Sequence, residues 1–223
     1  MAEKSDTNLN IPRLIFIPSV ITLAITVLRL VGELQHWPTS LFNPAAGGGG
    51  SIVGITWLVP IFGVYFGIKL AGAGRSPASA GKAIGYAILG FAITFAGGFV
   101  GFGLQKEFPG KLVIGLLLVA VGGVIPFFAW PALWKVLIAY GYAARIPVAI
   151  LMYFAIRGNW GTHYDVVPPG FPADTAFWPK YMQIAFVPQM LFWIVFTIII
   201  GSLFGSIAVA VARRSNKQEQ QTA

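Results

Sequence analysis

The chain has 223 residues, of which 57% are hydrophobic and only 10% are charged, and its mean hydropathy is +0.76. Soluble domains carry about 25% charged residues, so this composition excludes an ordinary soluble globular protein. The absence of cysteine excludes disulfides, thiolate metal sites, iron–sulfur clusters and cysteine nucleophiles. The net charge of +8 does not predict a nucleic-acid partner, because the basic residues lie near the ends of apolar runs and form no contiguous basic face.

Long apolar runs separated by short charged segments predict an all-α, polytopic integral membrane protein with about six transmembrane helices. The first run is too long for the hydrophobic region of a signal peptide, and no small-residue cleavage site follows it, so we expect it to be retained. The predicted helices span residues 14–34, 52–71, 83–104, 112–130, 133–156 and 182–212. They form one transmembrane domain at 14–212, between a polar segment at 1–13 and a basic, polar tail at 213–223 that we expect to be disordered.

The first predicted helix carries an intramembrane charge pair. Arg29 and Glu33 lie four residues apart, so their side chains share one helix face at pairing distance. We interpret them as an ion pair at the membrane interface, because an arginine near a helix end readily extends its charge toward the headgroups.

The second predicted helix combines small residues with a proline. Gly63 and Gly67 are four residues apart, a spacing that lets two membrane helices approach closely, so we predict a tight helix contact there. Pro60 lacks a backbone N–H and is expected to kink this helix. The glycine run at 47–50, just before the helix, predicts a flexible connector.

The fifth predicted helix carries Arg145 near its middle, two residues before Pro147. An arginine at that depth costs roughly 2.5 to 3.5 kcal/mol to insert, so it requires a partner or a water-filled cavity. Glu33 is the only acidic residue in a predicted helix. We therefore expect Arg145 to meet Glu33, backbone carbonyls freed by helix-interior prolines, or a bound ligand.

The longest polar loop, at 157–181, is rich in proline, glycine and aromatic residues, which predicts an ordered loop. Aromatic side chains are enriched at protein interfaces. Trp160, Tyr164 and Trp178 are therefore the candidates for docking a partner.

The two histidines of the chain, His36 and His163, fall on the same side of the membrane in the predicted topology. Together with Asp165 they offer nitrogen and oxygen ligands for a divalent metal. Asp165 can equally well orient His163 through a hydrogen bond, so both interpretations stay open.

The distribution of basic residues predicts that both termini are cytoplasmic and that loop 157–181 is extracytoplasmic. The predicted inner segments hold Lys4, Arg13, Lys69, Arg75, Lys82, Lys135, Arg213, Arg214 and Lys217, whereas the outer segments hold Lys106, Lys111, Arg157 and Lys180. The expected location is the cytoplasmic membrane of a bacterium.

No motif in the sequence names a substrate or a reaction, and three functions are compatible with it. The favoured one is a non-catalytic subunit of a membrane complex or homo-oligomer, whose ordered loop docks a partner. The second is a transporter or channel for a small, anionic solute that uses Arg145 as the binding charge. The third is a membrane enzyme with a metal at His36, His163 and Asp165. The expected partners are membrane lipids, including bound structural lipid, and other membrane subunits or further copies of the chain, and no organic cofactor is predicted.

Overall fold

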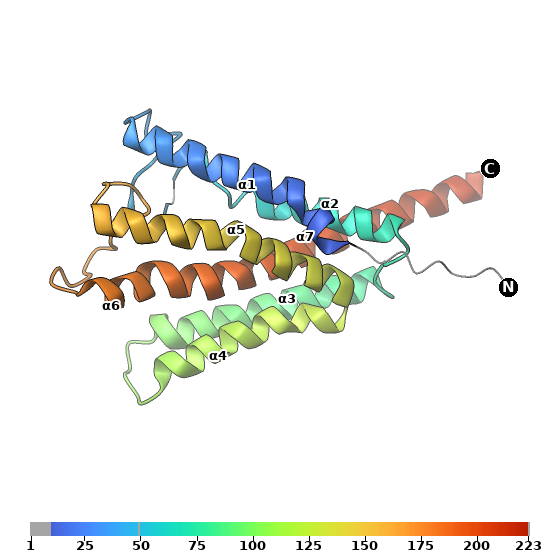
Figure 1. The fold of residues 1–223 in the computed structure, drawn as a ribbon. Helices are drawn as coiled ribbons and strands as arrows, with labels where there is room; N and C mark the ends of the chain where they lie inside the picture. Colours follow the sequence, from blue (N-terminus) through green and yellow to red (C-terminus); the bar gives the residue numbers. More distant parts are fainter. Residues whose placement is uncertain (1–9, 49, 223) are drawn as a thin grey trace.

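The computed structural model describes residues 10–48 and 50–222, with the side chains of the last helix described as far as Ser215. All regular structure in this part of the chain is helical, which confirms the predicted all-α class (Figure 1). The α-helices are α1 (Ile11–Leu34), α2 (Leu58–Gly72), α3 (Ala80–Gly98), α4 (Lys111–Val124), α5 (Pro131–Gly158), α6 (Phe177–Tyr181) and α7 (Trp193–Thr222). Short 3-10 or π-helical segments lie between them at η1 (Ala46–Gly48), η2 (Phe99–Gly103), η3 (Ile125–Phe128), η4 (Met182–Phe186) and η5 (Pro188–Phe192).

Five of the described helical stretches are long and apolar enough to cross a membrane, and α2 is a shorter apolar helix. At 1.5 Å per residue α2 is about 22 Å long, less than the roughly 30 Å of a bilayer's hydrocarbon core. Large apolar side chains such as Phe16, Phe95 and Phe128 are strongly exposed on the outside of the bundle. The lipid-facing exterior of a polytopic membrane protein has this character, because hydrocarbon in place of water surrounds it.

The connecting loops divide the bundle into two ends (Figure 1). The start of α1 and the end of α7 lie at one end, which we call the terminal end. The long loop 159–176 lies at the opposite end, with the loops that follow α1 and η2; we call this the loop end. Helix α7 packs against α2, α3, α4 and α5 and is therefore the central helix of the bundle.

Glycines hold α2 tightly against α7, as their spacing predicted. A Cβ atom added at Gly63 would lie 2.6 Å from the carbonyl oxygen of Gly201, and one at Gly67 would lie 2.7 Å from that of Gly205. The two backbones are thus in direct contact, and only glycine leaves room for this approach.

Helix α2 starts later than predicted, at Leu58 instead of residue 52, and it is not kinked at Pro60. A helix continuing upstream would bring the proline ring against the carbonyl of Thr56, four residues earlier. In the first turn of a helix a proline costs nothing, because that N–H has no partner anyway. Pro60 therefore sets where the helix begins, and the chain before it is non-helical.

The last span also differs from its predicted bounds. It begins at Phe177 instead of residue 182 and passes through two π-helical stretches, η4 and η5, before α7. Helix α7 continues to Thr222, through the segment from Arg213 that was expected to be a disordered tail. The Arg213 side chain donates a 2.8 Å hydrogen bond to the carbonyl of Pro77, which ties this helix to the loop between α2 and α3.

We predict that Gly63→Ala lowers the free energy of unfolding by about 1 to 3 kcal/mol, because the added methyl group meets backbone atoms of α7 that cannot move aside. The matched control is Gly85→Ala in α3, where an added Cβ meets no atom within 4 Å. This control should be neutral or slightly stabilising. Chemical denaturation in detergent micelles measures both variants, and equal losses would contradict the close α2–α7 contact.

Candidate functional site

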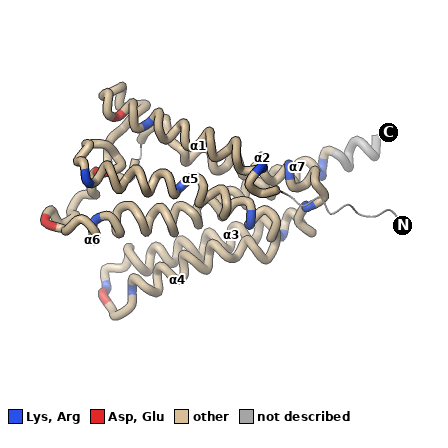
Figure 2. Tube along the Cα trace, viewed as in Figure 1, with Lys and Arg blue, Asp and Glu red and all other residues tan. Residues whose placement is uncertain are grey.

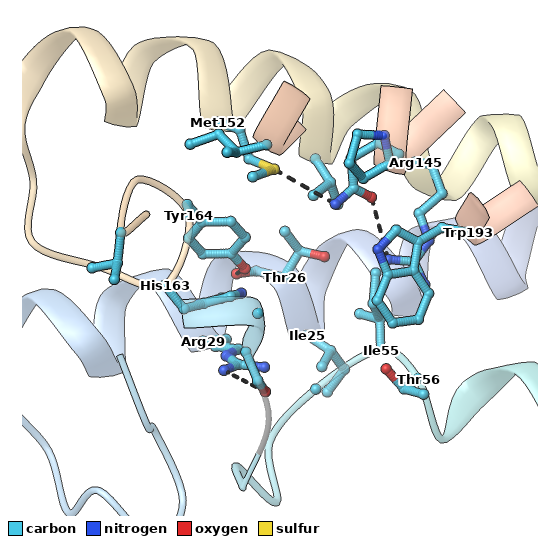
Figure 3. A pocket seen from close by; sticks show the side chains of 18 of the residues that line it. Ile25, Thr26, Arg29, Ile55, Thr56, Arg145, Met152, His163, Tyr164 and Trp193 are labelled. Atoms are coloured by element: carbon cyan, nitrogen blue, oxygen red, sulfur yellow. Dashed lines mark hydrogen bonds between the residues drawn. The ribbon is translucent and has the colours of Figure 1, made fainter. Parts of the chain in front are cut away.

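A cavity of about 310 Å³ lies inside the loop-end half of the bundle (Figure 3). Its walls come from α1, α5, the π-helical stretches η4 and η5, and the start of α7, and residues of two loops at this end also line it. Figure 3 shows Arg145 and Trp193 at one side of the cavity and Arg29 and His163 at the other. The cavity therefore brings together basic residues that are far apart in the sequence.

Two irregular segments make room for this cavity. The non-helical chain before α2 contributes Gly54, Ile55 and Thr56, and the π-helical stretches contribute Gln183 and Gln189. Non-helical backbone at membrane depth is tolerated only where it is buried in protein or lines a cavity. Single π-helical turns inside α-helices are frequent at functional sites.

Arg145 is the most unusual of the lining residues. It lies about 20 Å from either end of α5, taking 1.5 Å per residue, and it is only 4% exposed. Its guanidinium stacks on the Trp193 ring, 4.3 Å from the centroid, and Nη1 donates a long, 3.4 Å hydrogen bond to Oε1 of Gln189. Neither group carries a negative charge, so the cation of Arg145 has no counter-charge in these contacts.

Glu33 does not pair with Arg145, because two other groups occupy its carboxylate. Arg29 Nε donates to Oε1 at 2.8 Å, so the predicted pair forms near the end of α1, and both side chains are buried within the protein. His163 binds the same carboxylate from loop 159–176, through its backbone N–H at 2.8 Å and through Nδ1 at 2.6 Å. Glu33 therefore joins α1 to the loop.

Arg29 is held at two further points. Its Nη2 donates to the carbonyls of Asn43 and Gly48, at 3.0 and 3.1 Å. A Cβ at Gly48 would lie 2.8 Å from the His163 ring, and its backbone has a φ of +66° that favours glycine. The glycine run predicted to be a flexible connector thus includes a residue on which Arg29 and His163 pack directly.

The protonation of His163 follows from this environment. Burial lowers the pKa of His163 below its ordinary value, although the neighbouring Glu33 carboxylate opposes the shift. A neutral ring with its proton on Nδ1 donates to Glu33 and leaves Nε2 as an acceptor. Arg29 and Glu33 then cancel, and Arg145 gives the cavity a net charge of +1.

The loop aromatics predicted as docking residues do not all point outward. Tyr164 is only 4% exposed, and its hydroxyl donates to the carbonyl of Thr26 in α1 at 3.1 Å. The docking role predicted for Tyr164 is therefore wrong, because its side chain packs in the wall of the cavity. Trp160 is 38% exposed and Trp178 is 62% exposed, so these two remain accessible at the loop end.

The residues predicted as metal ligands are not brought together. His36 is exposed in the loop after α1, and Asp165 accepts hydrogen bonds within its own loop, from the backbone N–H groups of Gly161 and Thr162 and from the Thr162 hydroxyl. In the described part of the chain no group of three or more His, Cys, Asp or Glu side chains is placed to hold a metal ion. Asp165 orders the loop, and Glu33 orients His163.

The sequence did not point to Gln189 and Trp193 as partners of Arg145. A polar side chain inside an apolar run is itself a signal of function, and Gln189 fits that description beside Pro188. Trp193 carried no such signal, because a tryptophan in a membrane helix is ordinarily packing or an interface anchor.

Comparison of the chain with protein-family models, with curated proteins and with solved structures finds no match. The site itself is therefore the basis for assigning a function.

We predict that Glu33→Gln destabilises the protein by about 3 to 5 kcal/mol, because it leaves Arg29 as a buried charge without its counter-charge. The matched control is Glu107→Gln, which removes a carboxylate that also pairs with a basic residue four positions away but is 82% exposed. Lys111 is buried, but Glu107 is solvated and Lys111 keeps its hydrogen bond to the carbonyl of Leu104, so we expect the smaller loss of about 0 to 1 kcal/mol. Denaturant titration in detergent compares the two, and a loss at Glu33 no larger than at Glu107 would show that the buried network is dispensable.

Proposed function

We propose that the protein binds a small anionic solute in this cavity and carries it across the membrane. The observation that supports this proposal most strongly is Arg145, a buried cation at the centre of α5 that lines the cavity and has no carboxylate partner in the described residues. Intramembrane charges are costly and characteristically mark solute pathways.

The architecture around Arg145 supports a pathway as well as a binding site. Membrane transporters form their sites near the middle of the bilayer from interrupted helices, whose irregular backbone lines the site. Here α2 stops short of the loop end, and the last span is interrupted by π-helical turns at the same level of the bundle. The described residues thus combine a central charge with one shortened helix and one helix that contains π-helical turns.

The loop contacts favour a solute site over partner docking. His163 and Tyr164 both turn inward, onto Glu33 and Thr26, and both line the cavity. Of the three loop residues predicted to dock a partner, Trp160 and Trp178 keep exposed rings and Tyr164 does not. Loop 159–176 is therefore proposed to cover the cavity.

We further propose that the terminal end is cytoplasmic and that the loop end faces outward, in the cytoplasmic membrane of a bacterium. Figure 2 shows Lys and Arg at both ends of the bundle, whereas the acidic side chains that the structure describes lie at the loop end. Among the described side chains the terminal end thus carries basic charges alone, which supports the cytoplasmic assignment.

The test is flux in proteoliposomes with nitrate, acetate and benzoate as probe anions. Arg145→Gln should abolish the flux, because it removes the binding charge. It should leave the folded protein at least as stable, because it also removes an uncompensated buried cation. The matched control, Arg157→Gln, makes the same substitution at an exposed position of α5 and should retain the flux.

Unchanged flux in Arg145→Gln would overturn the proposal. Loss of folded protein in that variant would overturn it too, because it would show that Arg145 serves the fold.

A further inference from the structure

The cavity constrains the chemistry of its ligand beyond the sign of its charge. Resting on the proposed function, we infer that the ligand is an organic monoanion: one carboxylate-like head joined to a small apolar or aromatic body. The inference depends on three properties of the cavity, namely its net charge, the free donors of Arg145 and the composition of its walls.

The charge balance selects a single negative charge. Arg29 and Glu33 neutralise each other at 2.8 Å; the His163 ring faces the same carboxylate through Nδ1, and its burial lowers the pKa of His163 and so favours the neutral ring. Arg145 is then the one charge left to compensate among the described lining residues. A dianion would carry one buried charge without a partner, and such a charge costs several kcal/mol.

The geometry of Arg145 selects a planar, two-oxygen head. A guanidinium has five N–H donors, of which the described contacts use one, in the long bond to Gln189. Stacking on Trp193 holds the guanidinium plane in place while its edge keeps donors available. This rigid fork matches the two oxygens of a carboxylate.

Polar residues such as Thr26, Thr56 and Gln183 also line the cavity, but a large part of its wall is apolar, and that part favours an organic body. Val148 and Met152 follow Arg145 at three and seven residues, so they lie on the same face of α5 and line the same cavity. Ile25, Ile55 and Ile184 line it from three other segments. A strongly hydrated inorganic anion would lose its water against these side chains, whereas an aromatic or aliphatic body would gain from burial. The volume of about 310 Å³ limits the ligand to a small molecule.

The experiment is isothermal titration calorimetry on the full-length protein in detergent, with four probes of related shape or charge. Benzoate has the inferred chemistry, benzamide lacks the charge, phthalate adds a second charge, and nitrate lacks the organic body. We expect benzoate to bind at least tenfold more tightly than each of the other three. Arg145→Gln should abolish benzoate binding, and Arg157→Gln should leave it unchanged.

A second variant tests the apolar wall independently of the charge. Val148→Thr keeps the size of the side chain but places a hydroxyl in the cavity, so it should weaken benzoate binding several-fold and leave nitrate binding unchanged. Equal weakening of both probes would contradict the assignment of Val148 to the ligand's body.

The outcomes separate this inference from the proposal on which it rests. Phthalate binding as tightly as benzoate would overturn the charge balance, and benzamide binding as tightly would overturn recognition by Arg145. If nitrate is the one probe that binds, and its flux depends on Arg145, the inference of an organic ligand is wrong while the proposal of anion transport stands. An absence of both binding and flux for every anion would overturn both.

Discussion

The electrostatics of this bundle depend on how one carboxylate is used. Glu33 accepts from Arg29 on its own helix and from both the backbone and the ring of His163 in a distant loop. These contacts hold the carboxylate between Arg29 and His163, and the described residues form no ion pair between it and Arg145. The same residue thus holds loop 159–176 over the cavity and leaves the cation at the centre of α5 uncompensated.

Room for the cavity comes from departures from regular helix, each with a local cause. Pro60 prevents α2 from extending toward the loop end, and the chain before it passes along the cavity wall instead. On the opposite wall the last span widens into π-helical turns around Pro188. The glycine contact between α2 and α7 anchors the short helix, so the opening is confined to the loop-end half.

The membrane-helical architecture was predictable, because composition and the lengths of apolar runs depend only on the chain and its solvent. The pairing of Arg29 with Glu33 was also predictable, since it follows from helical spacing. The sequence could not predict which of the candidate partners Arg145 contacts. That choice depends on a loop residue, His163, which binds Glu33 from 130 positions away in the sequence. The inward orientation of Tyr164 could not be predicted either, because an aromatic residue in a loop gives the same sequence signal whether it contacts a partner or packs inside its own protein.

The π-helical stretches before Trp193 also set which side chains of the last span face the cavity. Each closes its hydrogen bonds one residue further along than an α-helix does, so it holds one surplus residue in the turn. That surplus rotates the residues nearer the loop end, Gln183 among them, about the helix axis relative to Trp193 and to the half that contacts α2 through glycine. The last span therefore presents to the cavity a combination of side chains that an uninterrupted α-helix would place on different faces.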